Sequence, residues 1–336
     1  MDAYIKAISY YLPQEVLTNE QLVEQFPEWT VEKVAKKIGI HARHVAAPNE
    51  TAGDMAYQAA ERLFTEHTID RQEIDFLLLC TQSADYVLPP TACVLQQRLG
   101  LPTTVGALDF DLGCSGFVYG LAVAKGLIAA HVARNVLLLT SETYTKYLHP
   151  RDKGNRTIFG DGAAATLIST EGSLRIGEFV LGTDGSGAES LIVHTGAARQ
   201  RTTVGDVSFD ENGNPSSPDY LYMNGADVLA FTLERVPAMV AEVLKKNQLE
   251  TEQVDRYVFH QANSYMLEFL RKKLHIPQEK MVLDLAHVGN TVSSTIPIAL
   301  YDSGLCAQQD TDIRHILLAG FGVGFSWGGV LLERKR

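Results

Sequence analysis

The residue in this sequence best placed for nucleophilic chemistry is a cysteine at a predicted strand-to-helix junction. Cys114 lies in DFDLGCSGFVYGLAVAKGLI, where alternating apolar residues predict a short strand and Gly113 allows a sharp turn into an Ala-rich helix. A helix N-terminus favours an anion, so we expect the pKa of the Cys114 thiol to be lowered. The competing interpretation is a small core cysteine, because free cysteines are among the most buried residues.

Three further features could complete an active site around Cys114. They are His260 in VDRYVFHQAN, Asn290 in VGNT, and the glycine-rich segment GFGVGFSWGG that begins at Gly320. Each also has a structural explanation: a hydrogen-bonded core histidine, a turn residue, and tight packing between strands. All follow predicted strands, and ligands of α/β sheets bind beyond the carboxyl ends of strands. We therefore expect the four features to converge on one cleft.

The elements that would position these residues occur twice in the chain. The segments IDFLLLCTQS, QQRLGLP, ALDFDLGCSG and NVLLLTSE recur, in the same order, as VDRYVFHQAN, RKKLHIP, VLDLAHVGNT and HILLAGFG, about 175 to 180 residues later. Four segments in one order at nearly one spacing indicate an internal duplication. The sequence therefore predicts an α/β fold of two homologous βα halves, residues 1–172 with the cysteine and residues 173–336 with the histidine, the asparagine and the glycine-rich loop.

Composition excludes several classes of protein. The 336 residues are 46% hydrophobic and 21% charged, as in a soluble globular protein, and the net charge of −11 without a long Lys/Arg run argues against nucleic-acid binding. No apolar run is long enough to span a bilayer, and the N-terminal stretch MDAYIKAISYYLP does not resemble a signal peptide. The four cysteines form no CxxC pair, so we expect neither a zinc site nor a disulfide framework, and a cytoplasmic location.

Five segments resemble the β-ketoacyl-acyl-carrier-protein synthase III family of thiolase-fold condensing enzymes. These segments are LGCSGF, FGDGAAAT, HQAN, GNTVSSTIPIAL and GFGVGFSWG. The resemblance implies two halves related by a pseudo-twofold axis in a five-layered α-β-α-β-α arrangement. It also implies a catalytic triad of Cys114, His260 and Asn290, and an oxyanion hole formed by the backbone N–H groups of Cys114 and Val323.

The implied reaction has two half-reactions. An acyl group first moves from a thioester to Cys114, which keeps it activated because acyl-cysteine is itself a thioester. A malonyl-carrier thioester then loses CO2, and the enolate oxygen accepts hydrogen bonds from His260 Nε2 and the Asn290 amide. The carbanion attacks acyl-Cys114 and yields a 3-ketoacyl product. Since hydrogen bonds alone stabilise the enolate, we expect no metal or organic cofactor.

Substrate recognition is expected to depart from that of relatives that use coenzyme A. Lys33 and Lys37 stand where those relatives carry a tryptophan and an arginine against the adenine, and Lys153 replaces an arginine near the nucleotide. Lysines can bind phosphates as point charges, and an acyl-carrier donor remains an alternative to acyl-coenzyme A.

For the acidic carrier protein we expect a basic patch on the helix after HQAN, formed by Arg271, Lys272 and Lys273. The alternative is an ordinary exposed helix face. Tyr265 and Ala230 occupy positions where family members often carry basic residues.

The acyl pocket is expected to differ as well. Leu88 in YVLPPTAC replaces the phenylalanine that limits chain length in acetyl-specific members, where it reaches in from the partner subunit of a homodimer. A leucine would leave room for a longer or branched primer.

Two other functions are compatible with the same residues. One is an acyltransferase that moves the acyl group from Cys114 to an alcohol or amine without forming a C–C bond. The other is a catalytically silent subunit that completes another chain's tunnel. A thiolase would need a second cysteine in the glycine-rich loop from Gly320, and this loop has none.

Overall fold

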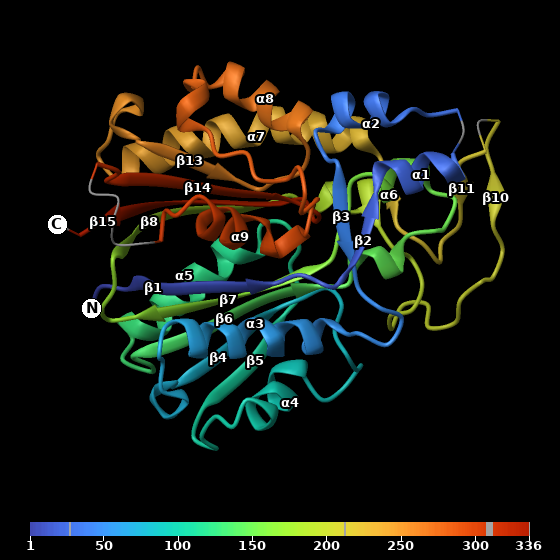
Figure 1. The fold of residues 1–336 in the computed structure, drawn as a ribbon. Helices are drawn as coiled ribbons and strands as arrows, with labels where there is room; N and C mark the ends of the chain where they lie inside the picture. The colour runs from blue at the N-terminus through green and yellow to red at the C-terminus, as the bar shows by residue number, and fades with distance from the viewer. Residues whose placement is uncertain (27, 212, 307–311, 336) are drawn as a thin grey trace.

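A nine-stranded mixed sheet runs through the molecule in the computed structural model, which describes residues 1–26, 28–211, 213–306 and 312–335 (Figure 1). Its strands, in the order in which they lie side by side, are Arg256–Phe259 (β13), His315–Gly322 (β14), Ser326–Arg334 (β15), Leu174–Thr183 (β8), Tyr4–Tyr11 (β1), Gly162–Ser169 (β7), Asn135–Glu142 (β6), Phe76–Cys80 (β4) and Gly106–Phe110 (β5). A short antiparallel pairing of β1 with β8 joins the two sides.

The two sides of the sheet repeat one pairing pattern. β4 lies parallel to β6, which is antiparallel to β7 and through it to β1. β13 likewise lies parallel to β14, which is antiparallel to β15 and through it to β8. β5 has only a partial counterpart, an isolated bridge between Tyr257 and Met281. The expected architecture of two homologous halves is confirmed, and the proposed boundary at 172/173 lies in the connection between β7 and β8.

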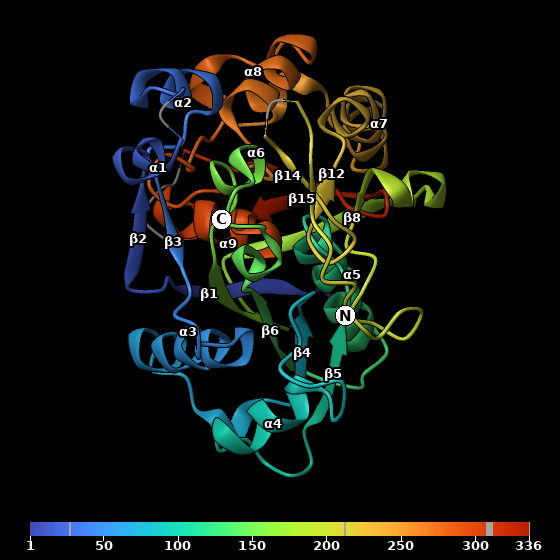
Figure 2. The same ribbon diagram turned by 90° about the vertical axis from the view of Figure 1, so that its right-hand side faces the viewer.

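Helices cover both outer faces of the sheet and separate its two sides (Figures 1 and 2). One outer layer holds Gly225–Lys246 (α7) and Ser264–Lys273 (α8), the other holds Ala52–Glu66 (α3) and Thr91–Arg98 (α4), and the central layer holds Gly116–Ala129 (α5) and Thr295–Asp302 (α9). This is the predicted α-β-α-β-α order of layers.

Smaller elements gather at one end of the molecule, the right-hand side of Figure 1. They are the helices Asn19–Gln25 (α1), Val31–Ile38 (α2) and Lys153–Arg156 (α6), and the strand pairs Glu15–Thr18 (β2) with Ala42–Val45 (β3), Leu191–Ile192 (β9) with Tyr222–Met223 (β12), and Ser208–Phe209 (β10) with Pro215–Ser216 (β11). None of the described helices has the length and apolar character needed to cross a membrane.

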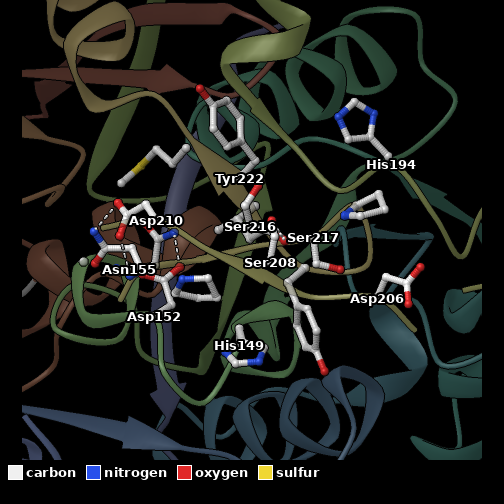
Figure 3. A pocket seen from close by; sticks show the side chains of 17 residues that line it. His149, Asp152, Asn155, His194, Asp206, Ser208, Asp210, Ser216, Ser217 and Tyr222 are labelled. Carbon is white, nitrogen blue, oxygen red and sulfur yellow. Dashed lines mark hydrogen bonds between the residues drawn. The ribbon is translucent and has the colours of Figure 1, made fainter. Parts of the chain in front are cut away.

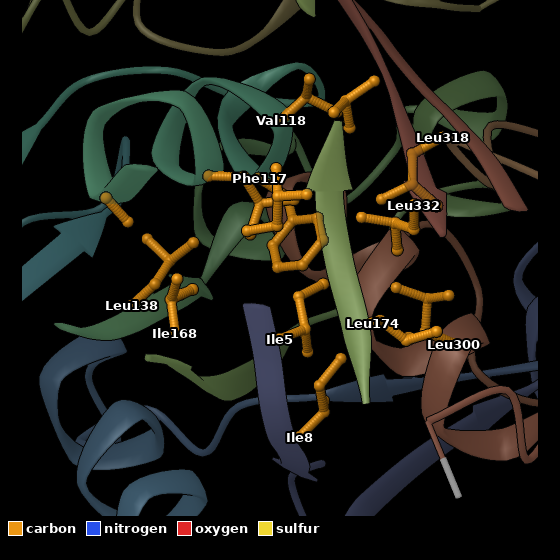
Figure 4. Close-up of a cluster of buried hydrophobic side chains, with 14 of the residues drawn as sticks. Ile5, Ile8, Phe117, Val118, Leu138, Ile168, Leu174, Leu300, Leu318 and Leu332 are labelled. Carbon is orange, nitrogen blue, oxygen red and sulfur yellow. The ribbon is translucent and has the colours of Figure 1, made fainter. Parts of the chain in front are cut away.

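The core of the central layer fixes the start of α5. Phe117 and Leu121 of α5 are fully buried among side chains of both sides of the sheet and of α9, including Ile5, Leu138 and Leu318 (Figure 4). Each such side chain contributes about 1.5–3 kcal/mol to stability through burial. Because the first turns of α5 are buried in this core, the residue just before the helix, Cys114, is held in a fixed position.

Candidate active site

Cys114 lies between β5 and α5, as the sequence predicted, and only 7% of it is exposed. β14 runs directly past it. A Cβ added at Gly322 would lie 3.0 Å from Cys114 Sγ, and one added at Gly320 would lie 2.9 Å from the Cys114 carbonyl oxygen. The glycine-rich segment therefore contains glycine where its backbone approaches the cysteine most closely.

Val323, the expected oxyanion-hole residue, follows β14 immediately. Its side chain belongs to the apolar cluster around Cys114 and lies against Gly113, since a Cβ added at Gly113 would be 2.7 Å from Val323 Cγ1. The structure therefore places Val323 beside the nucleophile.

His260 and Asn290 meet in the same buried region. Asn290 Nδ2 lies 3.5 Å from His260 Nε2, and the two residues are 4% and 2% exposed. His260 follows β13, and its ring packs edge-on against Phe321 of β14 at a centroid distance of 5.7 Å. Asn290 lies in the loop before α9. The predicted convergence of the histidine and the asparagine is thus present.

Val292 connects this pair to Cys114. Its side chain packs in the same buried cluster as Cys114, and its backbone N–H donates to Asn290 Oδ1 at 2.9 Å. The Asn290 side chain is therefore oriented with Oδ1 occupied and Nδ2 turned toward the histidine. Val292 adopts φ +57°, a left-handed conformation that is strained for a β-branched residue.

Thr295, which sequence reasoning missed, holds the other side of the His260 ring. Its Oγ1 lies 2.8 Å from His260 Nδ1 and 3.2 Å from the Val292 carbonyl oxygen. A hydroxyl that donates to this carbonyl accepts from Nδ1–H and leaves a lone pair on Nε2. A hydroxyl that donates to Nδ1 leaves a proton on Nε2.

Burial determines the protonation state of the Cys114 thiol and the His260 imidazole. It raises the pKa of the Cys114 thiol to about 12, and the negative charge of Glu142 acts in the same direction. It lowers the pKa of His260 to about 3. The expectation of a lowered cysteine pKa was wrong, because removing the thiolate from water outweighs the helix N-terminus. The resting site therefore holds a neutral thiol and a neutral imidazole.

A buried apolar cluster surrounds Cys114. Its buried members besides the cysteine are Tyr144, Leu148, Phe159, Leu191, Leu221 and Val292. Two of its residues, Leu221 and Met223, also line a polar cavity of about 840 Å³ (Figure 3). The cavity is further lined by His149, Asp152 and residues of the β10–β11 hairpin. It therefore adjoins the apolar cluster at the end of the molecule where the small elements gather.

Glu142 is a second group that the sequence did not single out. It ends β6, is fully buried, and accepts hydrogen bonds from Gln82, Ser83 and Ser293. Burial raises its pKa to about 8. A signal was available, because the internal repeat that aligns NVLLLTSE with HILLAGFG pairs Glu142 with Gly322, which lies against Cys114.

The expected substrate-binding lysines lie on the short helices α2 and α6. Lys33 and Lys37 are exposed and four residues apart on α2. Lys153 begins α6 and is ion-paired with Glu28. On α8, Arg271 and Lys272 both pair with Glu268, at 2.7 and 3.2 Å, so this single carboxylate offsets one of the three positive charges of the expected basic patch.

Leu88 is 78% exposed and lies next to Val87 and Tyr86, which are 92% and 59% exposed. Within this chain it is outside the cluster around Cys114. In the part of the chain that the structure describes, no group of three or more His, Cys, Asp or Glu residues is arranged to hold a metal ion.

A buried thiol linked through Val292 to an imidazole–amide pair, on two repeated βα halves in five layers, is the arrangement of a thiolase-fold condensing enzyme. Residues 108–185 match the family model described as 3-Oxoacyl-[acyl-carrier-protein (ACP)] synthase III, and residues 244–334 match the model of its C-terminal part. Over 327 residues, 96% of both chains, the sequence is 32% identical to the beta-ketoacyl-[acyl-carrier-protein] synthase III of Clostridium perfringens.

Solved structures agree. One crystal structure of a 3-oxoacyl-(acyl-carrier-protein) synthase III is 49% identical, with a TM-score of 0.95 over 99% of this chain and 100% of that chain. The 3-oxoacyl-(acyl-carrier protein) synthase of Burkholderia xenovorans LB400 is 33% identical, with a TM-score of 0.90 over 99% and 94%. The chain belongs to the 3-oxoacyl-[acyl-carrier-protein] synthase III family, which confirms the predicted family, fold and condensing activity.

Proposed function

We propose that Cys114, His260 and Asn290 carry out the two half-reactions of the condensation. The observation that carries this proposal is the buried contact between His260 and Asn290, tied through Val292 to the cluster that holds Cys114. Simple transfer of the acyl group to an alcohol or amine needs no enolate site, so this pair favours condensation over the acyltransferase alternative.

In the first half-reaction the neutral thiol gives up its proton as it attacks. Cys114 Sγ forms a bond to the acyl carbon, His260 Nε2 takes the thiol proton, and that proton passes to the leaving thiolate as the donor C–S bond breaks. The tetrahedral oxygen would accept hydrogen bonds from the N–H groups of Cys114 and Val323. Removing one such donor typically costs about 100- to 1000-fold in rate.

In the second half-reaction a C–C bond of the malonyl group breaks and releases CO2. The enolate oxygen accepts hydrogen bonds from Asn290 Nδ2 and from His260 Nε2–H, the form of the ring that the Thr295 hydroxyl supports when it donates to Nδ1. The enolate carbon bonds to the acyl carbon, and the Cys114 thiolate leaves and is reprotonated. Since hydrogen bonds stabilise the negative charge on both the tetrahedral oxygen and the enolate oxygen, we propose that no metal or organic cofactor takes part.

The proposed primer is longer or more branched than acetyl, delivered by acyl-coenzyme A or by an acyl carrier. The apolar character of the cluster beside Cys114 supports this, and so does Leu88 if a second subunit inserts it there. The exposed run of Tyr86, Val87 and Leu88 supports a homodimer, since apolar patches of this kind mark interaction sites.

For the carrier protein we propose a mixed docking surface on α8 and α2. Tyr265 and Phe269 are 58% and 43% exposed on α8 with their rings 6.2 Å apart, so the helix presents aromatic surface where a basic residue is common in the family. Lys33 and Lys37 on the adjoining α2 supply positive charge for an acidic partner. All four cysteines are free, which supports the proposed cytoplasmic location.

Intact-protein mass spectrometry tests the proposal. The protein would be incubated with malonyl-carrier protein and a panel of acyl-coenzyme A and acyl-carrier donors, to detect both acylated Cys114 and the 3-ketoacyl-carrier product. We expect both, with Cys114→Ala abolishing the product. Asn290→Ala should remain acylated while losing the product, and His260→Ala should lose the product and acylate more slowly, because the imidazole that takes the thiol proton is gone. Acylation without a condensed product in the unmodified protein would favour the acyltransferase, and no acylation from any donor would favour the silent subunit.

A further inference from the structure

Glu142 occupies a place in the active site that the condensation mechanism leaves without a role. The side chain is fully buried, yet no lysine, arginine or histidine of the described residues forms an ion pair with it. Instead both oxygens accept from the Gln82 backbone N–H, at 3.2 and 3.0 Å, and one each from Ser83 Oγ at 3.1 Å and Ser293 Oγ at 3.0 Å. A buried carboxyl held this way is costly to maintain for packing alone.

The donors Gln82 and Ser83 connect Glu142 to the Cys114 side of the site. Gln82 and Ser83 follow β4 in the N-terminal half, and a Cβ added at Gly113 would lie 2.7 Å from the Gln82 Oε1. Gln82 also accepts from the Tyr147 hydroxyl through its backbone carbonyl at 2.6 Å. By hydrogen bonding to the Gln82 backbone, Glu142 therefore holds Gln82 in position against Gly113, the residue that precedes Cys114.

The other donor leads to the enolate site. Ser293 directly follows Val292, whose strained backbone N–H orients Asn290. Ser294 Oγ lies 2.9 Å from Thr140 Oγ1, so two successive serines dock on alternate residues of β6. A strained backbone conformation persists only where surrounding contacts over-determine it. The Ser293–Glu142 hydrogen bond is one of the contacts that do so.

We propose that Glu142 is a positioning residue that aligns the Cys114 side of the site with the Asn290 side by binding Gln82–Ser83 from one half and Ser293 from the other. The inference rests on the proposed function, because it assigns Glu142 to the geometry of those two half-reactions. We call Glu142 and its two sets of donors the clamp. Acylation of Cys114 is expected to depend on the Gln82–Ser83 side of the clamp, and decarboxylation on the Ser293 side.

The charge of Glu142 has a second effect on the same site. The titratable groups that act on it or respond to it are Asp111 after β5, Cys80 at the end of β4, Cys114 before α5, and Tyr144 and Tyr147 in the turn after β6. Burial raises the pKa of Glu142 to about 8, so at neutral pH the carboxyl is protonated and donates to one of the two serine hydroxyls. Its ionised form accepts from both serines and raises the pKa of Cys114. Alkaline pH would therefore ionise Glu142 and oppose attack by the thiol.

Two serine variants separate the sides of the clamp. Ser293→Ala is expected to lower malonyl-carrier decarboxylation at least tenfold while leaving single-turnover acylation of Cys114 within twofold. Ser83→Ala is expected to do the reverse. Ser169→Ala is the matched control, a buried serine hydrogen-bonded to Asn135 at the opposite end of β6, and we expect it to change neither rate.

Glu142→Gln keeps the shape, since the serine hydroxyls can rotate to accept from its amide, and it removes the charge. We expect the alkaline fall in its acylation rate to be lost, an effect that a purely structural role would not produce. Serine variants that slow both half-reactions equally or neither, or an unchanged pH profile in Glu142→Gln, would overturn the inference. A wild-type protein that neither acylates nor decarboxylates would instead overturn the proposed function.

Discussion

Cys114 and His260 titrate far from neutral pH in opposite directions for one physical reason. Both are almost completely buried, so the charged form of each loses its hydration, which raises the pKa of the acid and lowers that of the base. An enzyme that stored a thiolate would react with any electrophile that reached it. A neutral pair keeps the nucleophile inactive until a thioester is in position and the proton can move.

Alkylation kinetics test this protonation state. In a Cys93→Ser background, which removes the exposed cysteine, we expect iodoacetamide to modify Cys114 slowly at pH 7. The rate should rise by about tenfold per pH unit near neutral pH, because only the thiolate reacts and its fraction grows with pH below the pKa. Above about pH 8 the rise should continue less steeply, because the ionisation of Glu142 raises the pKa of Cys114. Peptide mass spectrometry gives the rate at Cys114. A plateau below pH 8 would show a lowered pKa.

The Thr295 hydroxyl is the only described side chain that contacts His260 Nδ1 through a hydrogen bond. In Thr295→Val a buried ring nitrogen loses its partner, a penalty of about 1–3 kcal/mol. We expect kcat to fall by about tenfold or more, with little change in KM, because the ring loses the hydroxyl that supports its Nε2–H form. Thr295→Ser should restore most of the rate. Equal kcat in the valine and serine variants would contradict the assignment.

Among the elements, β14 contributes most to the site, because its glycines allow its backbone to lie against Cys114. In Gly322→Ala the new methyl group would stand 3.0 Å from Sγ and 2.9 Å from the cysteine Cβ, so the cysteine must shift. A misplacement of about 1 Å can cost about 100-fold in rate. We expect acylation of Cys114 to fall by about that factor, measured as a single-turnover rate.

Gly126→Ala is the matched control for this variant. Gly126 lies in α5, and no atom comes within 4 Å of a Cβ built there. Alanine should therefore stabilise the helix by roughly 0.5–1 kcal/mol and leave acylation unchanged. A similar loss of acylation in both variants would show that the effect of Gly322→Ala does not come from contact with Cys114.

The order of helices and strands was predictable because the same segments occur in both halves of the sequence. The repeat gave the order of strands, and the strand ends gave the positions of Cys114 and His260. Asn290 lies in a loop instead, because the strand expected before it is reduced to an isolated bridge at Met281. The raised cysteine pKa was not predictable, because the cluster that buries the thiol comes from residues 144–292, distant in sequence. The pairing of Glu268 with Arg271 and Lys272 was accessible in principle, since residues three and four apart on a helix are neighbours.

At the scale of the whole molecule, the run from Tyr86 to Leu88 contains the two most exposed large hydrophobic side chains of the described residues, Val87 and Leu88. We expect the protein to elute as a dimer and Val87→Lys to elute as a monomer with impaired condensation, since the lysine would place a charge in the interface. Light scattering coupled to gel filtration measures both masses. The control is Val132→Lys, a 60% exposed valine after α5 that lies outside this run. A monomeric wild type, or dissociation of both variants, would contradict the assignment.

The two ends of the chain meet at a single place on the sheet. Tyr4 at the start of β1 pairs with Arg175, and Arg334 at the end of β15 pairs with Leu174, at the opposite end of the strands from Glu142 and Gly322 (Figure 1). A protein fused to either end would therefore lie at the opposite end of the strands from the active site. A short linker joining the ends would also permit circular permutation, so that new ends opened beside the active site could tether a carrier protein to it.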